Sequence, residues 1–244
     1  MLTPLATARD ILVFQQQDGS CLTMAADTLG AIGEKAGDHL CVPPETCGRM
    51  TARVCLLETL AVGAVPTALL ALICNERDPT GLRLLAGIHA ELAAAGFPDI
   101  PVGGSSEDNV PTQMTALGIT LLGECQAPAW RRAQTGDGLY LLGLPYVGPE
   151  VVAHAETLVT AMHLRHIRAL PAVGDILPCG SRGIAWELQV LQREIALPLS
   201  LTPEIDSALL TKSAGPATCA LVTAREPFTL DAIPVLRLGA VGGP

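Results

Sequence analysis

The stretch Val54-Cys-Leu-Leu-Glu-Thr-Leu-Ala-Val-Gly-Ala64 decides much of the fold and holds one carboxylate, Glu58, among apolar residues. Residues 49–60 have helical spacing, and Gly63 is a suitable residue to end that helix. The apolar run that follows, Ala68–Cys74, is short and predicts a buried strand. A helix followed directly by a buried strand is typical of α/β layers.

Strands and helices alternate along the rest of the chain. Further helices are expected from Asp78 to Gly96, over residues 149–162 and over residues 184–195. Further strands are expected at residues 11–14, 21–26, 115–122, 139–142, 218–223 and 235–238. The polar segment 126–136 interrupts the alternation, which restarts after it. We therefore predict the α/β (α+β) class with two domains, residues 1–127 and a smaller one at residues 128–244.

The composition favours a protein with an aliphatic core and an acidic surface. Of the 244 residues 49% are apolar and 3% aromatic, and the formal net charge is −9. Residues 1–127 hold 14 acidic against 6 basic residues, a balance of −8, whereas residues 128–244 hold 10 against 9, a balance of −1. This argues against nonspecific nucleic-acid binding, which needs clustered Lys and Arg. The acidic half fits a site that organises Mg²⁺, and a solvated acidic surface fits equally well.

Cysteine usage and hydropathy predict a protein of the reducing cytoplasm. The eight cysteines form no Cys-x-x-Cys pair and no Cys/His cluster with zinc-finger spacing. Residues 1–9 lack the pattern of a signal peptide. The longest apolar run, Thr59 to Cys74, is short for a membrane span and contains Gly63 and Pro66. No membrane segment is therefore expected.

Three carboxylates lie in apolar or glycine-rich surroundings. Asp27 ends the apolar run 21–27, Glu58 lies in the opening stretch, and Glu107 follows Gly103-Gly-Ser-Ser106. An unpaired carboxylate in such a place is costly, so it is usually paired or bound to a metal. Hard oxygen ligands suit Mg²⁺, which takes one or two carboxylates plus nucleotide phosphates. We predict all three as metal ligands; the alternative is a polar helix face for Glu58 and loop caps for the other two.

Five segments occur in the same order as the motifs of a known superfamily. They are Asp27-Thr-Leu-Gly-Ala-Ile-Gly-Glu-Lys35, Glu58-Thr-Leu-Ala-Val-Gly-Ala64, Gly103-Gly-Ser-Ser-Glu107, Gly136-Asp-Gly-Leu-Tyr-Leu-Leu-Gly143 and Asp175-Ile-Leu-Pro-Cys-Gly-Ser-Arg-Gly183. Over nearly the whole chain, these segments resemble the superfamily of AIR synthase, thiamine-monophosphate kinase, selenophosphate synthetase and the hydrogenase maturation dehydratase, which has a PurM-like fold.

A narrower resemblance is to the AIR-synthase-related branch that includes α-ribazole kinase. The segments that carry it are Gly33–Lys35, Gly48–Arg53, Asn75–Gly81, Gly104–Glu107, Asp175–Gly183 and Lys212–Cys219. Two departures from the thiamine-monophosphate kinase pattern are visible. Its N-terminal Gly-Asp-Asp-Ala-Ala segment has no counterpart before Ile11, and Ser105 replaces the Asp of Gly-Gly-Asp-Thr.

The resemblance implies a homodimer in which the first domain contributes strands to a β-barrel, with ATP near the subunit interface. It implies an ATP- and Mg²⁺-dependent kinase that acts on a small-molecule precursor of a cofactor, with α-ribazole kinase as the named candidate. Two alternatives stay open. One is ATP-dependent cyclisation or amide activation in the manner of AIR synthase, and the other is a member that binds nucleotide without turnover.

The resemblance and local chemistry also select further site residues. Asp175 is expected to orient the substrate hydroxyl. The residues expected to bind the nucleotide or other anions are Gly33, Lys35, Arg53, Asn75, Ser106, Ser181 and Lys212. The alternatives are a solvated loop position for Lys35, pairing with acids for Arg53, a helix N-cap for Ser181 and a plain turn at Lys212.

Overall fold

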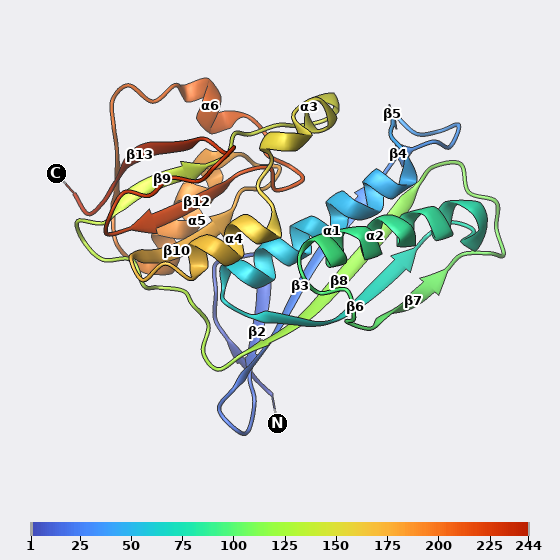
Figure 1. The fold of residues 1–244 in the computed structure, drawn as a ribbon, viewed down its shortest axis with the longest axis horizontal. Coiled ribbons are helices and arrows are strands. Elements are labelled where there is room, and N and C mark those ends of the chain that lie inside the picture. Colours follow the sequence, from blue (N-terminus) through green and yellow to red (C-terminus); the bar gives the residue numbers. More distant parts are fainter. Residues whose placement is uncertain (1, 244) are drawn as a thin grey trace.

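The computed structural model describes residues 2–243 and shows two large β-sheets beside a long central helix (Figure 1). The first sheet has six strands in the order β1-β2-β3-β8-β6-β7, and the second has five in the order β10-β12-β9-β13-β11. Strands β4 (Ile32–Gly33) and β5 (Leu40–Cys41) form a short parallel pair of their own. The sheets come from the first and second halves of the chain, as the restart of the alternation predicted.

The first sheet alternates between buried and open positions along its strands. Its strands are β1 (Thr3–Leu5), β2 (Ile11–Gln15), β3 (Cys21–Gly30), β6 (Val65–Ile73), β7 (Val102–Ser106) and β8 (Ala116–Cys125). Helices α1 (Pro44–Ala61) and α2 (Leu82–Ala94) follow in the same half, with the short π-helical turn η1 (Arg77–Gly81) before α2. In β3 the side chains of Cys21, Thr23 and Ala25 are buried, which puts the next residue of that parity, Asp27, on the helix-covered face.

The second half builds its sheet from shorter strands. They are β9 (Gly138–Leu142), β10 (Val173–Pro178), β11 (Leu199–Leu201), β12 (Ala220–Ala224) and β13 (Val235–Val241). Its helices are α3 (Pro149–Ala153), the 3₁₀ turn η2 (Ala155–Thr157), α4 (Ala161–Arg168), α5 (Ile184–Ile195) and α6 (Ser207–Thr211). Every residue of β9, β10 and β12 is buried, which is typical of strands covered on both faces.

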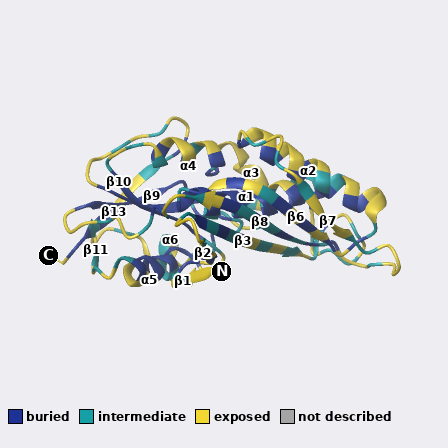
Figure 2. Ribbon diagram, turned by 90° about the horizontal axis from the view of Figure 1, so that it is seen from below, coloured by how far each residue is buried: buried dark blue, intermediate teal, exposed yellow. Residues whose placement is uncertain are grey.

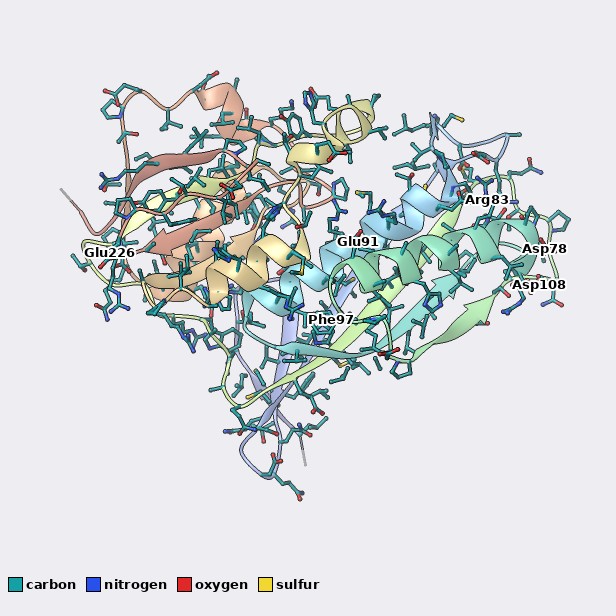
Figure 3. All side chains as sticks on the ribbon, viewed as in Figure 1. Asp78, Arg83, Glu91, Phe97, Asp108 and Glu226 are labelled. Atoms are coloured by element: carbon teal, nitrogen blue, oxygen red, sulfur yellow. The ribbon has the colours of Figure 1, made fainter. Side chains whose placement is uncertain are left out.

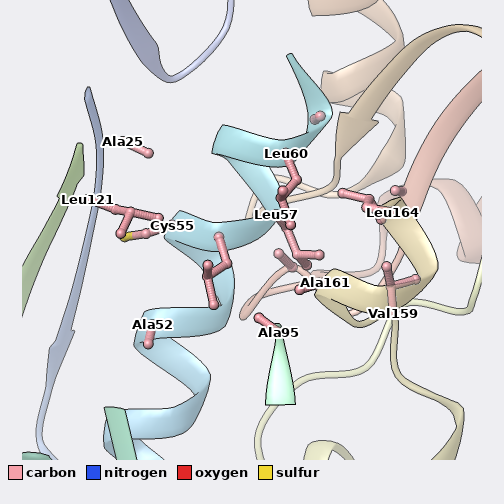
Figure 4. Packing of buried hydrophobic residues seen from close by; sticks show 14 of the residues in the cluster. Ala25, Ala52, Cys55, Leu57, Leu60, Ala95, Leu121, Val159, Ala161 and Leu164 are labelled. Carbon is pink, nitrogen blue, oxygen red and sulfur yellow. The ribbon is translucent and has the colours of Figure 1, made fainter. Parts of the chain in front are cut away.

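Helix α1 connects the two halves through one hydrophobic core. Cys55 of α1 faces Ala25 and Leu121 of the first sheet, and Leu57 faces Leu164 of α4 (Figure 4). The same core continues to buried residues of β10 and β12. The predicted boundary near residue 127 therefore separates the sheets but not the larger core. The division into two domains remains a prediction.

Two expected helices differ from the observed ones. The helix expected over residues 149–162 is wrong, because α3 ends at Ala153 and α4 begins at Ala161. Thr160 forces the new start, since its hydroxyl accepts from His163 N and its N–H donates to His163 Nδ1. The helix expected from Asp78 begins at Leu82, since Asp78 has extended backbone angles (φ −122°, ψ 125°), as expected for a residue before proline.

The other face of the first sheet is not covered by helices. Figure 2 shows α1 and α2 on one side of β3, β8, β6 and β7, and no helix of the described residues below these strands. Leu12, Leu70 and Leu72 on this face are 59%, 45% and 51% exposed. None of the helices in residues 2–243 is both long and apolar enough to cross a membrane.

Candidate functional site

A cavity of about 570 Å³ lies between the two halves of the chain. One wall consists of the end of β3, the β4–β5 segment and the first turns of α1. The opposite wall consists of residues from the loops 147–152, 180–181 and 213–217. The cavity is thus built from segments far apart in the sequence, and its size suits a small-molecule ligand.

Asp27 lies at the inner edge of this cavity. The residue is partly buried near the end of β3, and its side chain belongs to the face that packs against α1. Burial raises the pKa of Asp27 to about 6, and a hydrogen bond from the Thr28 backbone N–H opposes the shift. A carboxylate with a raised pKa beside a cavity is a candidate ligand for a cation.

Glu58 is close to Asp27 and lacks a partner. Its Oε2 atom is buried and makes no hydrogen bond within the described part of the chain. Burial raises the pKa of Glu58 to about 8; the charge of Arg9 opposes this effect, and the charges of Glu187, Asp10 and Asp27 add to it. The roles of Asp27 and Glu58 as metal ligands remain predictions.

Two acids of this cluster were not expected from the sequence. Asp10 directly precedes β2, and Glu187 lies on α5. Burial raises the pKa of Glu187 to about 7; the Gly180 N–H lowers it, Asp10 raises it and Arg182 lowers it. Asp10 stands where the sequence seemed to lack a counterpart of the N-terminal acidic motif. Glu187 could have been found by the criterion that selected Glu58, because it is also an acid within an expected apolar helix. No feature of the sequence distinguishes Asp10.

Glu107 lies apart from Asp27 and Glu58 within one chain, and its role as a metal ligand remains a prediction. The strand registers align Asp27 with Ile119, Ala71 and Gly104 across β3, β8, β6 and β7. Three strand spacings amount to about 14 Å, and Glu107 lies three residues farther along. Its Oε1 accepts the Asn109 N–H at 2.8 Å. Its neighbour Asp108 is labelled at the far end of α2 in Figure 3.

Asp175 is buried and its carboxylate is held by other parts of the chain, and its expected catalytic role remains a prediction. The residue is 0% exposed. Its carboxylate accepts hydrogen bonds from Arg9 Nη2 at 2.6 Å and from the backbone N–H groups of Arg131, Arg132 and Ala133 at 2.8, 2.8 and 2.9 Å. A carboxylate engaged in this way has no oxygen free for a substrate hydroxyl, and Asp175 is not part of the cavity wall.

Arg53 and Asn75 make hydrogen bonds within the chain, and their roles as nucleotide contacts remain predictions. Arg53 Nε and Nη2 donate to the two oxygens of Glu91 at 2.6 and 2.9 Å, and both side chains are buried between α1 and α2. Figure 3 labels Glu91 between these helices. Asn75 Nδ2 donates to Thr112 Oγ1 and the Met114 carbonyl, and its Oδ1 accepts the Ala116 N–H. Neither group is free to bind a ligand.

Gly33 and Lys35 lie close to the cavity, but Gly33 is tightly packed against its neighbours and Lys35 is paired with an acid. A Cβ atom on Gly33 would lie 2.1 Å from Thr115 Oγ1 and 2.6 Å from Asp38 Oδ2, so the glycine is needed for packing. Lys35 Nζ pairs with Glu76 Oε2 at 2.7 Å. A phosphate near Lys35 would have to compete with that carboxylate.

The last three expected anion contacts are in different places. Ser181 lines the cavity, as expected of a ligand contact. Lys212 pairs with Glu150 at 2.8 Å beside the cavity-lining residue Ser213. Ser106 lies at the end of β7, outside this cavity, and its hydroxyl donates to Asp108 Oδ2 at 2.7 Å.

The acidic cluster fits a cation that arrives with a nucleotide rather than a complete metal cage. Within residues 2–243 no group of three or more His, Cys, Asp or Glu is close enough to hold a metal alone. Mg²⁺ usually takes one or two carboxylates and completes its shell with phosphate and water oxygens. Asp27 and the unpartnered oxygen of Glu58 provide donors of this type.

Comparison with known proteins finds the same fold and one family. Residues 8–125 match the model of the AIR synthase related protein, N-terminal domain. The AaThiL structure complexed with AMPPCP and TMP is 14% identical, with a TM-score of 0.68 over 97% of this chain and 85% of that chain. The thiamine-monophosphate kinase of Stenotrophomonas maltophilia is 16% identical, with a TM-score of 0.65 over 99% and 89%. A chain of the HypE–HypF complex is 11% identical, with a TM-score of 0.68 over 96% of this chain and 87% of that chain. No curated protein matches the chain.

Proposed function

Because the chain belongs to the AIR synthase related superfamily, we propose that it is an ATP- and Mg²⁺-dependent kinase of a small alcohol in cofactor biosynthesis, with α-ribazole as the candidate substrate. The observation that supports this proposal is the buried Oε2 of Glu58, which has no hydrogen-bond partner among the described residues and lies on α1, the helix whose residues Thr51 and Val54 line the cavity together with Asp27. A buried acid without a partner is costly. A cation held with ATP phosphates would provide the missing partner.

The chemistry requires positioning and charge neutralisation. Bound Mg²⁺ would bridge two phosphates of ATP and neutralise charge on the group transferred to the substrate hydroxyl. Asp27 and Glu58 would hold the cation, and the cavity walls would orient the alcohol and exclude water. Asp10 would add negative charge close to this arrangement, since its charge raises the pKa of Glu58.

The charge of the cavity favours an uncharged substrate. Asp27 is the only charged residue among the described residues that line it; the others are apolar, hydroxyl-bearing or glycine residues. The nearby cations of Lys35 and Lys212 are paired with Glu76 and Glu150. A neutral nucleoside such as α-ribazole suits these walls better than a phosphate monoester such as the TMP bound in AaThiL.

A homodimer is part of this proposal. The uncovered face of the first sheet exposes Leu12, Leu70 and Leu72, and apolar faces of this kind usually mark an interaction site. A second copy could cover the face by packing its own sheet against it.

A phosphorylation assay tests the proposal. Purified protein is incubated with ATP, Mg²⁺ and α-ribazole, and the phosphorylated product is detected by mass spectrometry. We expect Glu58→Gln to abolish product formation, and the exposed Glu156→Gln to leave it unchanged. ATP binding without turnover on α-ribazole or other alcohols would support the binding-only alternative. Absence of Mg²⁺-dependent nucleotide binding would refute the proposed site.

A further inference from the structure

The N-terminal segment is clamped to the second half of the chain by Glu194. Its Oε2 accepts the Ala8 N–H at 2.6 Å and the Thr7 hydroxyl at 3.1 Å. Its Oε1 accepts Arg131 Nε at 2.9 Å. The carboxylate is almost completely buried. Residues 7 and 8 are therefore fixed on α5 immediately before β2 begins.

Arg9 and Asp175 form a second clamp one residue farther along. Arg9 Nη2 donates to Asp175 Oδ1 at 2.6 Å, and Nη1 donates to the Ile176 carbonyl at 2.5 Å. The two side chains are 1% and 0% exposed. The remaining Asp175 contacts hold the backbone of residues 131–133, which belongs to the connection between the two sheets. One buried carboxylate thus holds two separate segments against β10.

Asp10 follows this clamp and directly precedes β2, whose Ile11 lies opposite Ala25 of β3. The antiparallel register therefore directs residues 10 and 9 toward Ala26 and Asp27 of β3. In line with this position, the charge of Arg9 lowers the pKa of Glu58 and the charge of Asp10 raises it. Arg9 Nε is buried without a hydrogen-bond partner in the described residues, so the guanidinium is not saturated by Asp175 and Ile176. The clamp therefore controls where one cation and one acid stand relative to Glu58.

We propose that Asp175 and Arg9 are positioning residues for the cation site: their buried ion pair sets Asp10 and the Arg9 charge against Glu58 and so fixes the affinity for Mg²⁺ with nucleotide. This inference rests on the proposed function for its ligand. It gives Asp175 a role that does not require contact with substrate. Groups that orient metal ligands from behind typically change metal affinity about ten- to a hundredfold when altered.

The Arg53–Glu91 pair is a matched control. It is also a buried ion pair with good geometry. It joins α1 to α2 and, among the described residues, makes no hydrogen bond to the N-terminal segment that Asp175 holds. Breaking it tests what the loss of any buried pair does to stability. Asp175→Asn and Glu91→Gln are therefore compared with wild type, and Arg9→Lys is included as a milder variant that keeps the charge but loses the planar fork.

Titration calorimetry with AMPPCP in the presence and absence of Mg²⁺ gives the affinities, and hydrogen exchange gives the protection of residues 6–13. We expect Asp175→Asn to weaken Mg²⁺-dependent AMPPCP binding about tenfold or more and to speed exchange in residues 6–13. Arg9→Lys should show a smaller loss of affinity. Glu91→Gln should lower the melting temperature without either effect.

The outcomes separate this inference from the proposed function. Undiminished affinity in Asp175→Asn, or an equal loss in Glu91→Gln, overturns the positioning role while the kinase proposal stands. If the wild type binds no Mg²⁺–AMPPCP, the proposed function is refuted. Hydrogen exchange then tests the clamp by itself: unchanged protection of residues 6–13 in Asp175→Asn refutes the clamp as well. If Asp175→Asn does not fold, Arg9→Lys provides the same comparison.

Discussion

The Oε2 atom of Glu58 is buried and has no hydrogen-bond partner among residues 2–243, so Glu58→Gln is expected to stabilise the ligand-free protein at alkaline pH. Burial raises the pKa of Glu58 to about 8 from its ordinary 4.5. Because the pKa of Glu58 is higher in the folded than in the unfolded state, protonation of its carboxyl stabilises the folded protein, and this stabilisation is fully present below about pH 4.5. This contribution is lost as the pH rises through about 8.

The size of the effect follows from the pKa shift. Each pKa unit corresponds to about 1.4 kcal/mol, so ionised Glu58 costs on the order of 3–5 kcal/mol above pH 8. The amide in Glu58→Gln also lacks a partner, at a cost of about 1–3 kcal/mol. We therefore expect a net gain of about 2 kcal/mol at pH 9 and little gain at pH 5. For a chain of this length, 2 kcal/mol raises the melting temperature by about 4–8 °C.

Calorimetric melting curves of wild type and Glu58→Gln from pH 5 to pH 9, without divalent cations, measure this difference. Glu91→Gln is the control, because Glu91 is a buried acid that is paired with Arg53. Removing one partner of a buried pair costs about 3–5 kcal/mol, so this control should lower the melting temperature at neutral pH. If the difference between Glu58→Gln and wild type does not grow with pH, the reasoning about Glu58 is refuted.

Three further predictions follow from other parts of the molecule. Asp27→Asn should lower Mg²⁺-dependent nucleotide affinity at pH 8. The affinity of the wild type should decrease when the pH is lowered below about 6, because burial raises the pKa of Asp27 to about 6 and its protonation then competes with the cation. Calorimetric titration at several pH values checks both. Leu72→Asp on the uncovered sheet face should convert a dimer to a monomer in light scattering, whereas the comparably exposed Leu82→Asp on α2 should not. Gly104→Ala should lower the melting temperature by several degrees, because its Cβ would lie 1.9 Å from the Ala71 carbonyl oxygen and its φ is +144°; an unchanged melting curve would contradict the close approach of β6 and β7.

Local patterns in the sequence predicted most of the secondary structure. The helical spacing before Gly63 and the strand after it appear as α1 and β6. The prediction failed where a cap or a proline overrides periodicity, as at Thr160 and Asp78. Both failures have a local chemical cause that hydrophobic periodicity does not report. At Thr160 a side-chain hydrogen bond decides where the helix begins, and at Asp78 the following proline does.

The sequence does not reveal the surroundings of the acids that it selected. Glu58 was selected as an acid in apolar surroundings and Asp175 through the resemblance. Only the tertiary structure distinguishes them: Glu58 Oε2 has no partner, whereas Asp175 is satisfied by Arg9 and by the connection between the sheets. Asp10 was missed because an acid before a strand looks like an ordinary surface residue.

The sequence by itself determined the superfamily, the alternation of helices and strands, and the suspicion attached to Asp27 and Glu58. These properties depend on residues that are close in the chain. The tertiary structure decided which acids influence one another: the charges of Asp10 and Glu187 raise the pKa of Glu58, whereas Glu107 lies about three strands from Asp27. The physical reason is that charge interactions depend on distance in space, and strand order and helix packing set that distance.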